Sequence, residues 1–348
     1  MKLSQKILSL SLTVLFLASL AACGQRPAAQ DTPPAAPEVQ EPAAPEAQPP
    51  AEPAVLSVPM RVAALKGPTA MGMVRMMAAD GVDTFTLAGA ADEVTPALIK
   101  GDLDAACVPA NLASVLYNKT EGGVVCLAVN TLGVLYIVEN GEEIQSMGDL
   151  RGKTIVSAGK GSTPEYGLRY LLSENGVDPD RDVTIDWKSE HSECVAALAS
   201  GAATIAMLPQ PFVTAAQGKI ETLRTALDLT AEWNALDNGS AMITGVAVAR
   251  RAFVEEHPEA VERFLEEYAD SVGWVNANPA EAGALIAECG IVESAALAEK
   301  ALPHCNIVCL TGQEMAEKLS GYLQALADAA PESVGGALPR DDFYYGAS

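Results

Sequence analysis

Residues 61–77 of the chain read RVAALKGPTAMGMVRMM. The apolar run Val62–Leu65 has the length of a short strand, and the turn residues Lys66-Gly67-Pro68-Thr69 interrupt it. Apolar residues then recur with i, i+3, i+4 and i+7 spacing, which predicts a helix over Ala70–Ala79 with one apolar face. Thr69 or a neighbouring residue can cap the start of this helix. A strand, a tight turn and a helix N-terminus form a unit whose free backbone N–H groups can hold a ligand.

The same plan recurs at residues 153–165, KTIVSAGKGSTPE, which precede a second helical run containing leucines. An internal repeat supports it, because Thr84–Pro109 and Thr184–Pro209 align without a gap and share seven of 26 positions. Both copies have the order strand, turn, helix, glycine, strand and proline. Alternating strand-length and helix-period segments predict an α/β fold with mainly parallel pairing. We therefore expect two doubly wound βαβ lobes with a hinge and a central cleft, and a helical C-terminal third.

The N-terminus carries an export signal. Lys2 and Lys6 form a basic region, and the apolar stretch Ile7–Leu20 that follows is short for a membrane span. It ends in Leu20-Ala-Ala-Cys23-Gly, which resembles a bacterial lipobox. This resemblance implies cleavage before Cys23 and a lipid on its thiol, so that acyl chains anchor the protein on the extracytoplasmic side of the cell membrane. The alternative is an ordinary signal peptide or a short anchor with an incidental cysteine.

Composition divides the rest of the chain. Residues 26–59 are mainly Ala, Pro, Glu and Gln, and such a segment buries too little apolar surface to fold, so it predicts an extended spacer. The run Leu132–Glu139 is expected to end the first lobe, the chain to return near Thr244-Gly245, and Arg251 to about Ala330 to be nearly all helix. The predicted segments are a lipoprotein signal peptide (1–22), the lipid-anchored cysteine with a Pro/Ala-rich linker (23–59), the first part of lobe 1 (60–140), lobe 2 (141–240), and the return to lobe 1 with the C-terminal helices (241–348).

Charge and cysteine content exclude some partners. The 348 residues carry a formal charge of −23, and removal of Lys2 and Lys6 leaves 20 basic against 45 acidic residues, a net charge of −25. This argues against nucleic acid or an anionic membrane as an electrostatic partner. Six cysteines remain after Cys23, with no Cys-x-x-Cys pair and no metal-ligand pattern among the three histidines, so we expect no metal site. An exported chain can oxidise these cysteines, and burial as free thiols fits equally well.

In open α/β sheets, ligands bind beyond the carboxyl ends of the strands, where loops enter helices. A hinged cleft would bring six such loops together, three from each lobe. The candidate ligand-binding residues in these loops are Lys66, Gly67, Thr69, Gly89, Asn111, Lys160, Ser162, Thr163, Glu190, His191, Gln210 and Phe212.

Several of these residues have a purely structural alternative. The two lysines fit solvated surface charges, Ser162 and Glu165 have the spacing of a capping box, and Asn111 can cap its own helix. Glu190-His191 is the most enzyme-like pair, but consecutive side chains on an extended segment point apart, so one of them at most should face a ligand. Nucleophile-elbow, P-loop and dinucleotide-binding motifs are absent from the sequence, and we expect no catalytic residue and no cofactor.

Several segments of the chain resemble those of a known family. Gly101-Asp-Leu-Asp-Ala-Ala, Leu208-Pro-Gln-Pro-Phe and Asp149-Leu-Arg-Gly-Lys-Thr-Ile, together with the lipobox and spacer, are similar to ABC-transporter substrate-binding lipoproteins of the sulfonate, nitrate and thiamine-precursor (SsuA-like) group. The resemblance covers Met60 to Tyr345 and implies the type II periplasmic-binding fold. The family usually has an acidic residue where this chain has Gln210, which weakens any inference that a cationic amine is bound there.

The resemblance implies a monomer that captures a small organic solute and delivers it to a permease driven by an ATPase, without a chemical step and without nucleic acid. The competing hypotheses are an enzyme on the same fold, similar to chorismate dehydratase or to the fungal pyrimidine synthase of thiamine biosynthesis, and a two-lobed sensor ectodomain. Lys66, Lys160 and two helix N-termini favour an anion such as a sulfonate. Glu165, Glu190 and the aromatic residues favour a pyrimidine or another nitrogenous ring, and both solute classes stay open.

Overall fold

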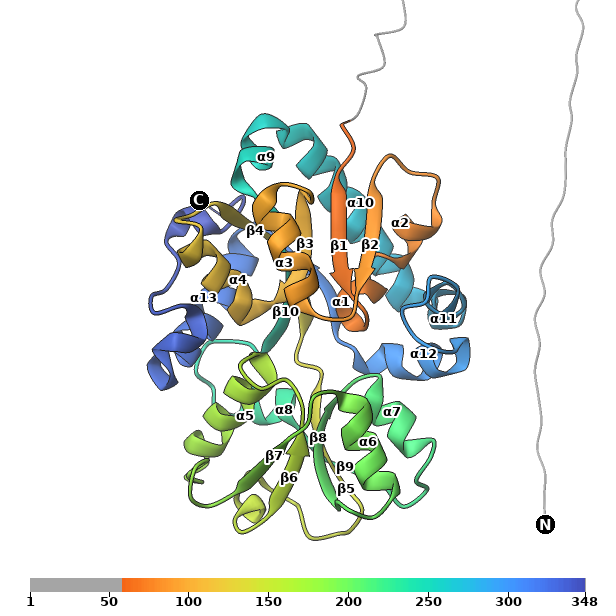
Figure 1. The fold of residues 1–348 in the computed structure, drawn as a ribbon, viewed down its shortest axis with the longest axis vertical. Coiled ribbons are helices and arrows are strands. Elements are labelled where there is room, and N and C mark those ends of the chain that lie inside the picture. Colours follow the sequence, from red (N-terminus) through yellow and green to blue (C-terminus); the bar gives the residue numbers. More distant parts are fainter. Residues whose placement is uncertain (1–57, 348) are drawn as a thin grey trace, which may run out of the picture. The chain divides into compact units, whose positions relative to one another are not determined.

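Two β-sheets organise the computed structural model, which describes residues 58–347 (Figure 1). The expected signal peptide, Cys23 and nearly all of the expected linker lie outside the described residues. Within residues 58–347, no helix combines the length and the apolar character needed to cross a membrane. The fold is α/β, as predicted.

The first sheet has six strands in the order β11-β4-β10-β3-β1-β2. Strand β1 pairs in parallel with β2 and β3, whereas β10 is antiparallel to both β3 and β4. The strands are β1 (Arg61–Leu65), β2 (Thr84–Ala88), β3 (Ala105–Pro109), β4 (Val124–Leu132), β10 (Ile243–Arg250) and β11 (Ile307–Leu310).

The second sheet has five strands in the order β7-β6-β8-β5-β9. Its three parallel strands are followed by the antiparallel β5 and then by β9, so it repeats the order found in the first sheet when that sheet is followed from β2. The strands are β5 (Leu135–Glu139), β6 (Thr154–Ser157), β7 (Thr184–Trp187), β8 (Ile205–Pro209) and β9 (Arg224–Asp228). The duplicated lobes are therefore confirmed.

The crossing between the lobes differs from the prediction. Strand β4 ends at Leu132, and β5 begins at Leu135 in the second sheet, so the expectation that one strand over 132–139 closes the first lobe is wrong. Both strands are almost entirely buried, and apolar continuity does not reveal which partner a strand chooses. Gly133 lies at the crossing, where a Cβ atom would lie 2.1 Å from Thr230 Oγ1. The return of the chain through β10 agrees with the prediction.

The helices of the internal repeat also match their expected places. They are α3 (Ala91–Lys100) in the first lobe and α6 (His191–Ala199) in the second. Outside the repeat, the first lobe also contains α4 (Ala110–Lys119), and the second contains α5 (Thr163–Glu174), α7 (Phe212–Gln217) and α8 (Leu229–Ala235). The helix α3 lies between β2 and β3 as α6 lies between β7 and β8, which is the order that the gapless alignment predicts. Strand β9 and helix α8 were not predicted.

The helix expected over residues 70–79 is divided into α1 (Pro68–Met71) and α2 (Val74–Ala78). Between them the carbonyl of Gly72 accepts a hydrogen bond from Ser271 Oγ, at 2.7 Å, in the long helix α10 (Pro258–Ala277). A Cβ atom on Gly72 would lie 3.0 Å from the Tyr268 hydroxyl, so a larger residue there would crowd the contact between the two segments. The single-helix prediction is therefore wrong, because a tertiary contact interrupts the pattern.

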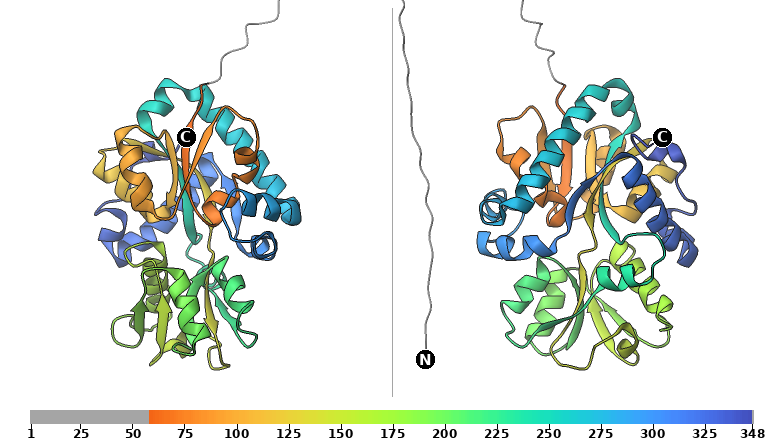
Figure 2. Two further views of the ribbon diagram at one scale, coloured as in Figure 1. Left: turned by 45° about the vertical axis from the view of Figure 1, so that its right-hand side comes forward. Right: turned by 180° about the vertical axis from the view of Figure 1, so that it is seen from behind.

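The C-terminal third is largely helical, as predicted, although β11 interrupts it. Helix α10 packs across one face of the first sheet (Figure 2), where its Phe264 and Tyr268 share a core with Val62 and Cys107. The opposite face of the sheet is covered by α4 and α13, so alternate residues of each strand meet different helices. The other helices of this third are α9 (Arg251–Glu256), α11 (Pro279–Glu288), α12 (Ala295–Ala301) and α13 (Gly312–Ala329).

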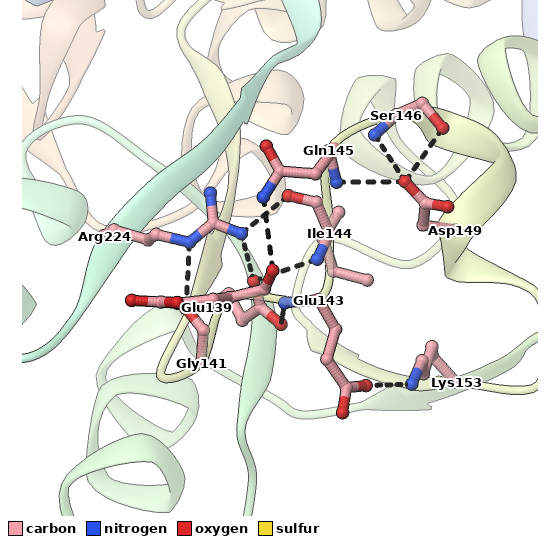
Figure 3. Close-up of polar contacts among 10 residues, drawn as sticks. Glu139, Gly141, Glu143, Ile144, Gln145, Ser146, Asp149, Lys153 and Arg224 are labelled. Atoms are coloured by element: carbon pink, nitrogen blue, oxygen red, sulfur yellow. Dashed lines mark hydrogen bonds and ion pairs between the residues drawn. The ribbon is translucent and has the colours of Figure 1, made fainter.

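A buried ion pair closes one end of the second lobe (Figure 3). The Glu139 side chain is 4% exposed, and its carboxylate accepts hydrogen bonds from Glu143 N at 3.0 Å and from Ile144 N at 3.1 Å, while pairing with Arg224. Arg224 also donates to the carbonyls of Gly141 and Ile144. One arginine and one glutamate thus bind four backbone polar groups of the turn after β5.

Replacing Arg224 with methionine should lower the free energy of unfolding by about 2 kcal/mol, because it leaves the Glu139 carboxylate buried without its counter-ion. Arg224 itself is partly exposed, which limits the loss. Urea denaturation would measure it. Arg169→Met is the matched control, because the Arg169 side chain is 32% exposed but its partner Asp180 is 70% exposed, and a loss below about 1 kcal/mol is expected. Equal losses in the two variants would contradict this assignment.

Candidate functional site

Residues from both lobes border one cavity of about 340 Å³. The first lobe contributes Lys66 and Gly67 from the turn after β1, together with residues between α11 and α12. The second lobe contributes residues of α6 and the start of α7, where Pro211 and Phe212 lie. Three of the predicted ligand-binding residues, Lys66, Gly67 and Phe212, are therefore brought together although they are far apart in the sequence.

His191 is the first residue of α6 and immediately precedes Ser192, which borders this cavity. Its ring packs on Phe212 with 5.2 Å between the ring centroids, and its buried Nδ1 has no hydrogen-bond partner among the described residues. Burial lowers the pKa of the His191 imidazole to about 4, so the ring is neutral at physiological pH. A nitrogen of a neutral imidazole that has no partner in the protein can donate or accept one hydrogen bond with a ligand, depending on which ring nitrogen carries the proton.

The neighbouring Glu190 faces elsewhere. It is exposed, and its carboxylate accepts a hydrogen bond from Ser192 Oγ at 3.0 Å. Glu190 and His191 therefore form no acid–base pair, in agreement with the expectation that consecutive side chains diverge.

Asn111 and Thr163 join the two lobes. Thr163 Oγ1 at the start of α5 donates a hydrogen bond of 3.1 Å to Asn111 Oδ1 at the start of α4, and both residues are buried. The Asn111 amide nitrogen donates to the carbonyl of Ser333, at 3.1 Å. The two predicted site residues are therefore in contact, but their polar atoms form hydrogen bonds within the protein. The bond between Asn111 and Thr163 links the two lobes.

Replacing Thr163 with valine should lower the free energy of unfolding by about 1–3 kcal/mol, because the change keeps the side-chain shape and leaves the buried Asn111 oxygen unpaired. Thr95→Val is the matched control, since Thr95 bonds only to the Ala91 carbonyl of its own helix and should lose little. Guanidinium unfolding of the two variants compares them. A loss no greater for Thr163 than for Thr95 would rule out a bond between the lobes that contributes to stability.

Glutamates occupy the N-termini of three helices that follow the candidate loops. Glu93 Oε1 accepts from Gly89 N at 3.1 Å and from Ala90 N at 2.9 Å before α3, and Glu193 Oε2 accepts from Ser189 N at 3.0 Å before α6. Before α5, Glu165 Oε2 accepts from Gly161 N at 2.7 Å. These carboxylates satisfy backbone donors and offset the positive end of each helix dipole. The identity of Glu93 and Glu193 in the repeat thus reflects one shared capping role.

Other predicted residues bind their own elements. Ser162 Oγ donates to the Gly159 carbonyl, at 2.8 Å, and Glu165 accepts from Gly161 N and not from Ser162 N, so the predicted capping box does not form. Thr69 Oγ1 donates to the Leu65 carbonyl, at 2.9 Å, so of the two options, Thr69 or a neighbouring residue, Thr69 is not the cap; the cap position is Gly67, which has no side chain to accept a hydrogen bond. Gln210 accepts from Thr214 Oγ1, at 2.8 Å.

Two predicted residues, Gly89 and Lys160, are exposed and lie outside the lining of the shared cavity. Gln210 instead borders a second space of about 550 Å³ beside Lys300 and His304. Contact of any of these residues with a ligand stays a prediction.

The structure adds residues that the sequence reasoning missed. Asn130 is fully buried, and its amide nitrogen has no partner among residues 58–347. Gly245 lies against it, because a Cβ atom there would be 2.5 Å from Asn130 Oδ1 and 2.7 Å from Thr69 Cγ2. A glycine inside an apolar strand signals such a close approach and could have marked the place. Ile291 and Val292 border the cavity with no local signal in the sequence.

Within residues 58–347, no group of three or more His, Cys, Asp or Glu side chains lies close enough together to hold a metal ion. The six cysteines of this part of the chain are free thiols, and four of them are buried. Burial raises the pKa of Cys107 and of Cys305 to about 12, so these thiols stay protonated.

Comparison with known proteins gives a consistent result. A family model described as "ABC transporter, phosphonate, periplasmic substrate-binding protein" matches residues 82–291. A putative binding protein of Brucella abortus is 26% identical over 218 residues, which are 61% of this chain and 65% of that protein. The matched part of the chain thus spans 65% of the length of this curated relative, slightly less than two thirds.

Solved structures share the fold. An ABC transporter protein of Parabacteroides distasonis has a TM-score of 0.69 at 23% identity, covering 82% of this chain and 98% of that one. The periplasmic aliphatic sulphonate binding protein SsuA of Escherichia coli has a TM-score of 0.65 at 17% identity, covering 81% and 92%. At these identities the likeness concerns the two-lobed architecture.

Proposed function

Because this chain belongs to the family of periplasmic substrate-binding proteins of phosphonate ABC transporters, we propose that it captures a small organic solute between its lobes and delivers it to a permease. The observation that carries the proposal is the shared cavity, which Lys66 and Gly67 border from one lobe and Phe212 from the other. A solute bound there contacts both lobes at once. Its binding energy is then coupled to the angle between them.

Two crossings of the chain form the hinge in this proposal. The first is the short link between β4 and β5, and the second connects α8 to β10. Rotation about such links opens or closes the cleft with little change inside each lobe. A permease driven by an ATPase would recognise the closed form and accept the solute, and no chemical step takes place on the binding protein.

The proposal includes a lipid anchor on Cys23, supported by the basic residues, apolar stretch and lipobox of the first 24 residues. Such an anchor holds a monomer on the extracytoplasmic side of the cell membrane, within reach of its permease. An enzyme on the same fold is less well supported, since Glu190 and His191, the pair closest to an acid–base couple in sequence, point apart.

Native mass spectrometry of the full chain, as its host processes and anchors it, tests the proposal. The expected result is a small molecule that copurifies and leaves on denaturation, with a protein mass that corresponds to a chain beginning at lipid-modified Cys23. Conversion of the bound molecule to a product over time would support the enzyme hypothesis instead. If nothing copurifies and no sulfonate, phosphonate or pyrimidine raises the melting temperature, solute capture is refuted.

A further inference from the structure

The walls of the shared cavity are mainly apolar. Val195 of α6 and Phe212 of α7 line it from the second lobe, and Ile291, Val292 and Leu297 line it from the first. The volume of about 340 Å³ lies within the range of small-ligand pockets. A solute that fills this space would bury apolar surface against both lobes, which is favourable only if the solute has an apolar body.

The same cavity carries a positive balance of charge. Lys66 borders it from the first lobe and Lys219 from the second, and Glu293 is the one carboxylate in its lining. Neither lysine forms an ion pair within the described part of the chain, and both side chains are exposed. Two ammonium groups beside an apolar wall suit a ligand that has a negative group at one end.

The helix N-termini argue against a small, highly charged anion. Such an ion loses much hydration on binding and needs free backbone N–H groups or several charged donors in return. Before α6, whose residues line the cavity, Glu193 accepts a hydrogen bond from Ser189 N, and its negative charge at that helix N-terminus would repel a dianion. The neutral His191 adds no positive charge.

From these three observations we infer that the solute is an amphiphilic organic anion, with one singly charged group near Lys66 and Lys219 and an apolar body between α6, α7 and the α11–α12 connection. This inference rests on the proposed function and specifies its solute. It excludes a compact anion without an apolar body, such as methylphosphonate, as the preferred ligand, although the matching family model is that of phosphonate-binding proteins.

Titration calorimetry on the full chain in phosphatidylcholine nanodiscs tests the inference, because detergent would compete for an apolar site. Empty nanodiscs give the baseline. The probes are hexanesulfonate, methanesulfonate, methylphosphonate and 1-hexanol. Each buried methylene strengthens binding about fourfold, so hexanesulfonate should bind roughly tenfold or more tightly than methanesulfonate, and also more tightly than methylphosphonate or hexanol.

Matched variants locate the binding site. Ala196 is exposed and lines the cavity on α6, so Ala196→Trp should fill the space and weaken hexanesulfonate binding by roughly tenfold or more. Ala235 is an exposed alanine on α8 outside the lining, and Ala235→Trp should leave binding unchanged. Replacing both Lys66 and Lys219 with glutamine should weaken binding of hexanesulfonate but not of hexanol.

The outcomes separate this inference from the function on which it rests. The inference of an amphiphilic solute is overturned if methylphosphonate is the preferred ligand, or if Ala196→Trp does not change the binding of hexanesulfonate. In both cases the proposed capture of a solute still stands. Absence of binding by all four probes also overturns the inference of an amphiphilic solute, and the copurified molecule of the native spectrum then decides whether solute capture survives.

Discussion

Replacing Trp233 with alanine is expected to lower the free energy of unfolding by about 3–5 kcal/mol, the range for removal of a large buried aromatic side chain. Trp233 is fully buried in α8, where its ring lies 4.7 Å from Tyr170 and 5.2 Å from Tyr322 between ring centroids. Tyr322 belongs to α13, so the aromatic contact connects the second lobe to the C-terminal helices. The alanine variant leaves a cavity and removes both ring contacts.

Trp274→Ala is the matched control for this prediction. Trp274 is partly exposed and packs at the edge of the first lobe, with Arg75 5.7 Å from its ring centroid. Urea denaturation of both variants should therefore show a clearly smaller decrease in the free energy of unfolding for Trp274→Ala than for Trp233→Ala. Similar losses would show that Trp233 does not hold the contact between α8 and α13.

Lowering the pH from 7 to 4 is expected to destabilise the protein through His191 by roughly 3 kcal/mol. Burial lowers the pKa of His191 to about 4 in the folded protein, whereas an unfolded histidine titrates near 6.5. Between these values the unfolded chain binds a proton that the folded chain does not. Stability is therefore retained above pH 6.5 and lost as the pH falls toward 4.

The variant His191→Leu isolates this effect, because carboxyl groups also titrate in the same range. The difference in free energy of unfolding between the variant and the parent protein should grow in favour of the variant as the pH falls from 7 to 4. A constant difference between His191→Leu and the parent would show that folding does not lower the pKa of His191.

Much of the fold follows from local pattern. The sequence repeat of Thr84–Pro109 in Thr184–Pro209 corresponds to two sheets with the same strand order. The glutamates at matched positions of the repeat accept hydrogen bonds from backbone N–H groups before equivalent helices. The site was predicted less completely. Lys66, Gly67 and Phe212 meet at one cavity, but Asn111, Thr163 and Gln210 bind the protein itself, since a sequence does not tell which donors the fold has already satisfied.

Periodicity was therefore sufficient for the α/β class, the two lobes and most element types, because a strand or helix depends on residues close in sequence. Long-range contacts settled the rest. The pairing of β5 with β8, the break at Gly72 and the inclusion of Ile291 and Val292 in the cavity each involve residues far apart in the chain. Their free energy comes from packing and hydrogen bonds that exist only once the chain has folded, so no local pattern encodes them.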